Sequence, residues 1–347
     1  MSHYFLRFSP ILLLTLLLTA CGQSAGGLYD DYLSRLSNVL NEPVVKRETP
    51  APQSAPRSRD LQLDIPDVRV TPLSYWNLRH CELFRLISER NSILGRVAPP
   101  NTVWRYEARV LAAIEDCKAH PDTGDSQQEQ LEAWAEEKRA AWPGATWNGT
   151  VASPEVRQIW SASQSAWKPG HVPSQAEQYA DLQTLTDWAR QWPDADMPDD
   201  RTFSDVYQRL GRHSTGGQWR RSVQISLGGL TAANTMLQQA IAAQRLCPAG
   251  VATRSAEHAQ NVLTLFFIGE VQPYLVQLNR EGERLLEAFS DLTEATGEEV
   301  ADWQAFMAGL EAELDSLQQI TRDHADYWQT LLAQCDLQIG LQSSAWR

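Results

Sequence analysis

The last third of the chain contains three long stretches in which apolar residues recur at helical spacing. They cover residues 222–246, 255–291 and 298–338, and each is much longer than an average helix of about 11 residues. Pro273 predicts a kink in the middle stretch. No Asn-Gly hairpin signal separates runs of alternating apolar and polar residues. The sequence therefore predicts an all-α protein, a multi-helix bundle of helical hairpins with long C-terminal helices.

Shorter helical patterns precede these stretches. Pro99-Pro100 separates the first two patterns, so they should form a hairpin, and Pro143-Gly144 is expected to end the third. Ser153-Pro154 has the N-cap and first-turn proline of a helix start. The other predicted helices cover residues 74–91, 101–120, 125–142, 174–192 and 202–213.

Composition excludes several classes of protein. The 347 residues include 43 acidic and 30 basic side chains, and 43% of the residues are hydrophobic, which is typical of a folded soluble protein rather than a disordered or polytopic one. The net charge of -13 opposes attraction to nucleic-acid phosphates, so we expect no nucleic-acid partner. Residues 250–347 carry 16 acidic and 5 basic side chains, which indicates a solvated acidic face or a docking surface for a basic partner.

The N-terminus has the pattern of an export signal. Arg7 precedes a short apolar run, Ile11 to Leu18, which is too short to span a bilayer. The following Leu18-Thr19-Ala20-Cys21 resembles the lipobox of bacterial lipoproteins, which implies cleavage before Cys21 and acylation of its thiol. Gly22 follows in place of the aspartate that retains lipoproteins in the inner membrane. We therefore expect lipid anchoring to the bacterial outer membrane, facing the periplasm. An ordinary secretory signal with an incidental Cys21 is the alternative.

Composition also suggests the division of the chain. Residues 43–72 contain six prolines, which prevent a regular helix and favour an extended segment. At about 3.1 Å per residue, such a linker would reach roughly 90 Å and hold a domain away from the membrane. The predicted parts are a signal peptide (1–20), a lipid-anchored tether with a short helix (21–42), a proline-rich linker (43–72) and a helical domain (73–347).

Four cysteines remain after Cys21 is assigned to the lipid, and an oxidising compartment favours two disulfides with three possible connectivities. The midpoint between Cys81 and Cys117 falls at the Pro99-Pro100 break, so antiparallel helices would bring the two cysteines level. The midpoint between Cys247 and Cys335 falls close to Thr296-Gly297. The hairpins therefore favour Cys81 with Cys117 and Cys247 with Cys335; four free buried thiols are the alternative.

Several of these features occur together in one family. The lipobox, the helix from Tyr32 to Leu40, the proline-rich linker and above all the segment from Cys81 to Gly95 resemble the Gram-negative lipoproteins grouped as domain of unknown function 3080. The most specific part is the Arg90-Asn91-Ser92 turn with Leu94-Gly95. The resemblance implies a lipidated helical envelope protein, and it supplies no activity and no catalytic residues.

The matches to catalytic motifs in the sequence lack the context that their chemistry requires. Residues 22–26 match the G-x-S-x-G pattern but lack the flanking strand and helix, and residues 165–168 match S-x-x-K without its partner motifs. No HExxH, Walker A, GxGxxG or CxxC pattern occurs. We therefore expect no cofactor, no metal site and no assignable catalytic residue.

Two titratable residues stand out by position. His324 shares one stripe of the last helix with Leu317, Trp328 and Leu331, which favours a core histidine over a metal ligand or a general base. Glu270 follows the most apolar run of the mature chain, and partial burial would raise its pKa as a general acid requires. A glycosidase needs a second carboxylate, and the sequence places none opposite Glu270.

Tryptophan is unusually abundant, with 13 in the chain. Trp147 and Trp167 lie beside glycine or proline in apparent loops, so they are the candidate binding residues for a protein or glycan partner. The alternative is that these rings pin their loops to the body of the protein. The predicted function is that of a non-enzymatic binding or structural protein of the envelope, attached to the membrane through its lipid. A hydrolase acting on cell-wall or lipid substrates through carboxylates is the second hypothesis.

Overall fold

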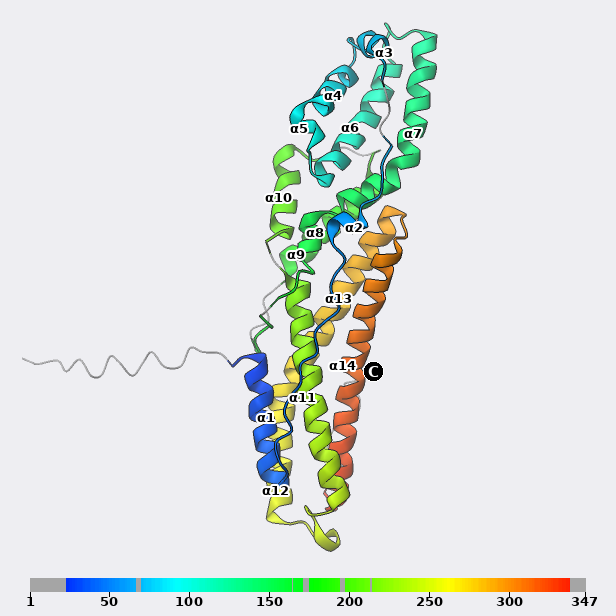
Figure 1. Cartoon of the computed structure of the whole chain (residues 1–347). Helices are drawn as coiled ribbons and strands as arrows, with labels where there is room; N and C mark the ends of the chain where they lie inside the picture. The colour runs from blue at the N-terminus through cyan, green and yellow to red at the C-terminus, as the bar shows by residue number, and fades with distance from the viewer. Residues whose placement is uncertain are drawn as a thin grey trace, which may run out of the picture.

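A computed structural model describes residues 23–66, 70–163, 165–170, 175–193, 197–212 and 214–337 (Figure 1). The predicted signal peptide and Cys21 lie outside these residues. Within them, the regular elements are all helices, which confirms the all-α prediction. They are α1 (Ala25–Leu40), α2 (Ser58–Leu61), α3 (Pro72–Asn77), α4 (Glu82–Asn91), α5 (Ile93–Arg96), α6 (Pro100–Lys118), α7 (Asp125–Gly149), α8 (Pro154–Gln158), α9 (Ala176–Gln191), α10 (Asp200–Leu210), α11 (Thr215–Ala243), η2 (Pro248–Gly250), α12 (Arg254–Val262), η3 (Leu263–Val271), α13 (Gln272–Thr296) and α14 (Ala301–Ala333).

The molecule is elongated and has two parts (Figure 1). Helices α3 to α6 and the first part of α7 form one end, which we call the head (residues 70–142). Helices α1, α11, α12, η3, α13 and α14 run side by side and form the long bundle. None of the helices in the described ranges combines the length and apolar character that a membrane span needs.

The long bundle has an irregularity where the sequence predicts a kink. The predicted helix 255–291 is divided into α12, the π-helical segment η3 and α13. Pro273 lies in the first turn of α13, directly after η3. Proline cannot donate a hydrogen bond to the carbonyl four residues earlier, and a local change of helical register accommodates that loss. We therefore attribute the π-helical turns to Pro273.

Helix α1 belongs to the core of the long bundle. Tyr29, Tyr32 and Leu36 on α1 are each at most 1% exposed, and α1 packs against α11 and α12. Gly229 of α11 allows this contact, because a Cβ there would lie 2.3 Å from the ring of Tyr29. The short helix predicted within residues 21–42 is therefore present as α1, and its apolar stripe is buried by helices from the C-terminal half.

The proline-rich segment is not a free linker. Residues 43–66, which we call the strap, run along the bundle from the end of α1 towards the head and are extended except for the short helix α2 (Figure 1). Leu61 is 1% exposed, and Ala55, Leu63 and Ile65 pack against the main core. The prediction that residues 43–72 act as a spacer is therefore wrong for the strap, because its apolar side chains pack against the main core of the bundle.

Hydrogen bonds from distant side chains hold the strap in place. An extended proline-rich backbone makes no internal hydrogen bonds, so its carbonyl groups remain available as acceptors. Bulky donors on α7, α8 and α11 satisfy several of them. Trp147 Nε1 donates to the carbonyl of Leu61 at 2.7 Å, Arg157 donates to that of Pro56 at 2.7 and 3.0 Å, and Arg220 donates to that of Gln53 at 2.5 Å.

Both predicted disulfides are present. Cys81 is bonded to Cys117 with a Cα–Cα distance of 5.4 Å, and Cys247 is bonded to Cys335 with a Cα–Cα distance of 5.1 Å. The first bond fixes the start of α4 to the last turn of α6, and the second fixes the loop after α11 to the end of α14. The hairpin argument from the sequence is confirmed for both pairs.

The strap can be tested through Asn148, whose side-chain oxygen accepts from the amide of Leu63 at 2.8 Å and whose nitrogen donates to the Leu63 carbonyl at 2.7 Å. Asn148→Asp keeps the acceptor and loses the donor. We expect local loosening of about 1–3 kcal/mol, and trypsin should then cleave after Arg57 and Arg59 roughly tenfold faster. The exposed Asn261→Asp is the matched control. Unchanged cleavage rates would show that this bridge does not hold the strap.

Candidate functional site

The head has its own small core, separate from that of the long bundle. Helix α4 packs against α6, and α6 packs along α7. Nine buried residues form this core, and a disulfide closes one end of it. A cluster of this size gives limited stability, so the Cys81–Cys117 bond is an important restraint on the head. The core residues are Leu78, Leu83, Leu86, Val110, Ala113, Ile114, Cys117, Leu131 and Ala135.

A cavity of about 910 Å³ opens beside this core. Its volume lies within the range of small-molecule sites, about 300–1,000 Å³. The apolar part of its wall comes from α4, α6, α7, α3 and the residue Val70 before α3, and the polar part includes three basic side chains, Arg90, Arg96 and Lys138. Glu107 is the one carboxylate among the described residues that line it. The apolar lining residues are Val70, Pro72, Tyr75, Leu83, Ile87, Tyr106, Val110, Ile114 and Trp134.

A buried ion pair lies in the cavity wall. Lys138 Nζ is 2.6 Å from Glu107 Oε2, and the two side chains are only 8% and 5% exposed. Taking both charges out of water is costly, so apolar residues in their place would often be equally stable. The stability of the head core therefore does not require this pair, and the pair makes the cavity wall more polar.

No motif in the sequence points to Glu107 and Lys138 as a pair. Helices α6 and α7 form an antiparallel hairpin that turns between residues 118 and 125. Reflecting position 107 through that turn gives a position within two residues of 138, so the argument used for the cysteines places Glu107 and Lys138 at the same level. No sequence signal distinguishes a buried charged pair from the solvated charges around it.

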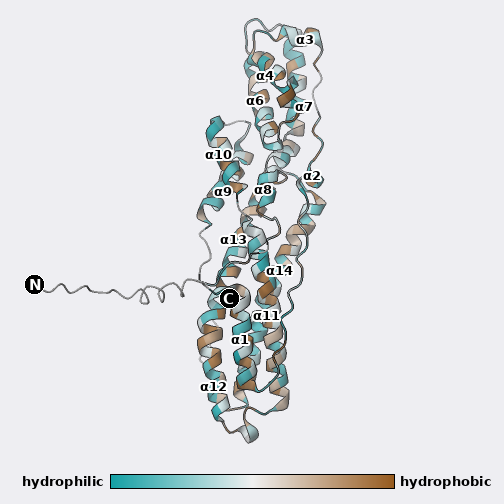
Figure 2. Cartoon of the chain, turned by 60° about the vertical axis from the view of Figure 1, so that its left-hand side comes forward, coloured by the Kyte–Doolittle hydropathy of each residue, from teal (hydrophilic) through white to brown (hydrophobic). Residues whose placement is uncertain are grey.

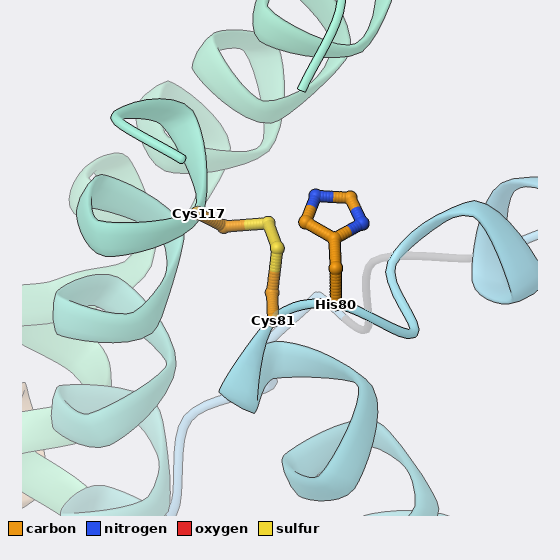
Figure 3. A group of neighbouring side chains, drawn as sticks. All are labelled: His80, Cys81 and Cys117. Carbon is orange, nitrogen blue, oxygen red and sulfur yellow. A yellow bond between two sulfur atoms is a disulfide. The ribbon is translucent and has the colours of Figure 1, made fainter. Parts of the chain in front are cut away.

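A second cluster has the composition of a metal site. The ligand atoms of His80, Cys81 and Cys117 lie within 4.8 Å of one another (Figure 3). However, the two sulfur atoms are bonded to each other, and metal binding to cysteine requires a free thiolate. His80 Nε2 also forms a 2.9 Å hydrogen bond with the hydroxyl of Thr123. In this oxidised form the cluster is a disulfide beside a histidine rather than a ligand set.

His324 lies at the centre of a buried polar network. Its Nε2 is 2.7 Å from the hydroxyl of Tyr32, and its Nδ1 is 2.5 Å from Asn234 Oδ1. Because Oδ1 can only accept, Nδ1 carries the proton and Nε2 accepts from Tyr32. Trp328 Nε1 in turn donates to the Tyr32 hydroxyl at 2.9 Å. The network joins α1, α11 and α14 and leaves His324 neutral and satisfied, as the prediction of a core histidine requires.

Glu270 does not have the environment of a general acid. It lies in η3 and its side chain is exposed, so the partial burial considered from the sequence is absent. The apolar run before it turns Leu263 and Phe267 into the core, while position 270 faces away from it. The structure therefore gives no support to the carboxylate route of the hydrolase hypothesis at this residue.

Trp147 is buried rather than displayed. Helix α7 continues through Pro143 to Gly149, so the prediction that it ends at Pro143-Gly144 is wrong. This extension carries Trp147 into the main core, where it is 0% exposed and packs edge to face against Trp303. The strap covers its indole nitrogen through the Leu61 carbonyl.

Trp167 is also buried, with 2% of its surface exposed. Its backbone amide donates to Ser222 Oγ at 2.9 Å, and its carbonyl accepts from the hydroxyl of Tyr274 at 2.8 Å. The hypothesis that Trp147 and Trp167 form an exposed binding surface is therefore wrong. Trp167 pins its own irregular segment to the bundle, as the alternative interpretation holds, whereas Trp147 lies in helix α7 and donates to the strap.

The burial of His324 makes stability depend on pH. Burial lowers the pKa of His324 from 6.5 to about 3, so the unfolded chain binds a proton that the folded protein excludes. Above pH 6.5 both states hold a neutral His324 and no stability is lost, whereas the free energy of unfolding falls as the pH drops from 6.5 towards 3, by a total on the order of 5 kcal/mol.

We therefore expect His324→Gln to show a flatter decline in the free energy of unfolding over this window, measured by urea unfolding at successive pH values. His258→Gln, which removes an exposed histidine on α12, is the matched control. Parallel pH profiles for wild type and His324→Gln would contradict the assignment.

Comparisons with known proteins agree with the resemblance noted from the sequence. A family model described as a protein of unknown function, DUF3080, matches residues 29–339. No curated protein and no solved structure is similar enough to match. The family model spans α1, the strap, the head and the long bundle up to the end of α14. Since it covers most of the sequence, the chain belongs to the DUF3080 family.

Proposed function

We propose that this protein is a lipid-anchored, periplasm-facing envelope protein that binds an amphipathic anion in the head cavity. The anchor is supported by the Leu18-Thr19-Ala20-Cys21 pattern at the end of a short apolar run. The binding role is supported by one observation above all, the cavity of about 910 Å³ whose wall combines apolar and basic side chains.

The position of α1 determines how closely the anchor would hold the body. Only three residues separate Cys21 from Ala25, the first residue of α1, so the four steps between them can span at most about 14 Å. Because α1 is packed in the core, the long bundle would lie at the membrane surface rather than at the end of a long spacer. No long linker would then separate the bundle from the lipid anchor.

The chemistry of the cavity favours a ligand with an apolar chain and an anionic group. Arg90, Arg96 and Lys138 outnumber Glu107, so the wall has an excess of positive charge. Isoleucine, leucine, valine and tryptophan side chains offer the rest of the surface to hydrocarbon. Hydrolysis by a carboxylate pair has no counterpart among the described lining residues, because Glu107 is held by Lys138.

The anchor is tested by Cys21→Ser. Without the thiol, the protein should no longer incorporate labelled fatty acid and should be released from the membrane fraction by a high-salt wash, since attachment that resists salt depends on the acyl chains. The double variant Cys81→Ser/Cys117→Ser removes two other cysteines and should retain the label. Continued labelling and membrane association of Cys21→Ser would exclude this anchor.

The cavity is tested with dansyl-labelled undecanoic acid as a fluorescent probe. Arg96 is exposed at the cavity wall, and Arg96→Gln should weaken binding of the acid about tenfold or more, because a hydrogen bond to a charged group is worth about 1.5–3 kcal/mol. Binding of the corresponding dansyl-labelled alcohol should hardly change. Arg254→Gln removes an exposed arginine at the start of α12 and serves as control. Absence of probe binding to the wild type would refute the proposed cavity function.

A further inference from the structure

The head exposes an unusual group of aliphatic side chains. Ile93, Leu94 and Val97 are 83%, 80% and 74% exposed, the three highest values among the large apolar residues described. Single exposed aliphatic residues are common on protein surfaces, whereas adjacent ones commonly mark an interaction site. We call these three residues the apolar tip.

The backbone of the apolar tip is fixed by specific contacts. Ser92 caps α5 by accepting from the amide of Gly95, and Arg90 donates to the Gly95 carbonyl. Gly95 also packs directly on the end of α4, where a Cβ atom would lie 2.3 Å from the carbonyl oxygen of Glu89. The turn is therefore held in one conformation, and that conformation directs the apolar tip into solvent.

The charges around the apolar tip differ from those of the rest of the protein. Residues 70–99 contain four arginines and two glutamates, in a chain whose net charge is -13. Arg85 pairs with Glu82 and Glu89, which leaves the other arginines of the segment without a carboxylate in the described part of the chain. Arg90 and Arg96 lie immediately beside the apolar tip.

Exposed aliphatic residues flanked by unpaired arginines match the surface of an anionic bilayer. The aliphatic side chains can enter the boundary between headgroups and acyl chains, while the arginines remain with the lipid phosphates. The acidic surface elsewhere on the chain would be repelled by the same lipids. In Figure 1 α5 lies on the same side of the molecule as α1, and Figure 2 shows hydrophilic and hydrophobic residues mixed along the helices of the head.

We propose that the apolar tip docks the head onto an anionic lipid surface. The inference rests on the proposed envelope location for the identity of the membrane, but the docking itself requires neither the lipid anchor nor an occupied cavity. A tip inserted beside the cavity would place the cavity opening close to lipid, the source of amphipathic anions.

The test uses the chain from residue 22, which contains every described helix and lacks the acylated cysteine. The probe is co-sedimentation with vesicles of equal parts phosphatidylcholine and phosphatidylglycerol, compared with phosphatidylcholine alone. Wild-type protein should sediment with the anionic vesicles. The triple variant Ile93→Ser/Leu94→Ser/Val97→Ser should bind them about a hundredfold more weakly, equivalent to on the order of 3 kcal/mol for three side chains.

The matched control is Val251→Ser/Leu265→Ser/Val276→Ser, which removes three exposed aliphatic residues from elsewhere on the surface. It should bind vesicles like the wild type. Arg96→Gln should reduce the preference for anionic vesicles about fivefold, because one arginine near such a surface contributes about 1 kcal/mol. Thermal melts of all variants should superimpose, since the substituted side chains are exposed.

Several outcomes would overturn the inference. One is wild-type protein that stays in the supernatant, and another is a triple tip variant that sediments as the wild type does. Self-association in sedimentation velocity that the tip variant abolishes would instead assign the apolar tip to a second copy of the chain. The tip residues do not line the cavity, so the tip variant should keep its affinity for dansyl-labelled undecanoic acid, which separates this test from that of the proposed function.

Discussion

The closing of the long bundle depends on the contact between the first and the last described helices. Tyr32 of α1 and His324 of α14 are 292 residues apart in sequence, yet their side chains form a 2.7 Å hydrogen bond in the core. Asn234 and Trp328 complete the network, so none of its polar atoms is left buried without a partner. Apolar packing supplies most of the stability, and this network determines which faces of α1, α11 and α14 meet.

Much of the fold could be predicted from helical periodicity and from the positions of glycine and proline. The all-α class, the long C-terminal helices and both disulfides follow from local pattern and hairpin geometry. The strap could not be predicted in this way, because the carbonyls of Leu61 and Pro56 accept from Trp147 and Arg157, which lie 86 and 101 residues away. Trp147 looks like a loop residue in the sequence because it follows Pro143-Gly144. It is buried in the protein because the strap, far away in sequence, covers its indole nitrogen.

The candidate site could be predicted only in part. The segment from Cys81 to Gly95 stood out as the most specific part of the family resemblance, and it forms one wall of the head cavity. Glu107 and Lys138 did not stand out, since each belongs to a helix rich in other charged residues. Their burial results from the approach of α6 and α7, which single-sequence patterns do not quantify. The apolar tip was likewise hidden, because exposure is a property of the assembled surface.

The position of α1 has a consequence for the order in which the chain can fold. During synthesis α1 emerges first, whereas its partners α11, α12 and α14 follow some 190 to 290 residues later. At about 5–20 residues per second, the last partner appears roughly 15–60 s after α1. Throughout that interval the stripe of Tyr29, Tyr32 and Leu36 has no native surface to cover it. Until the C-terminal helix has been made, this apolar stripe is either exposed to water or covered by something other than its native partners.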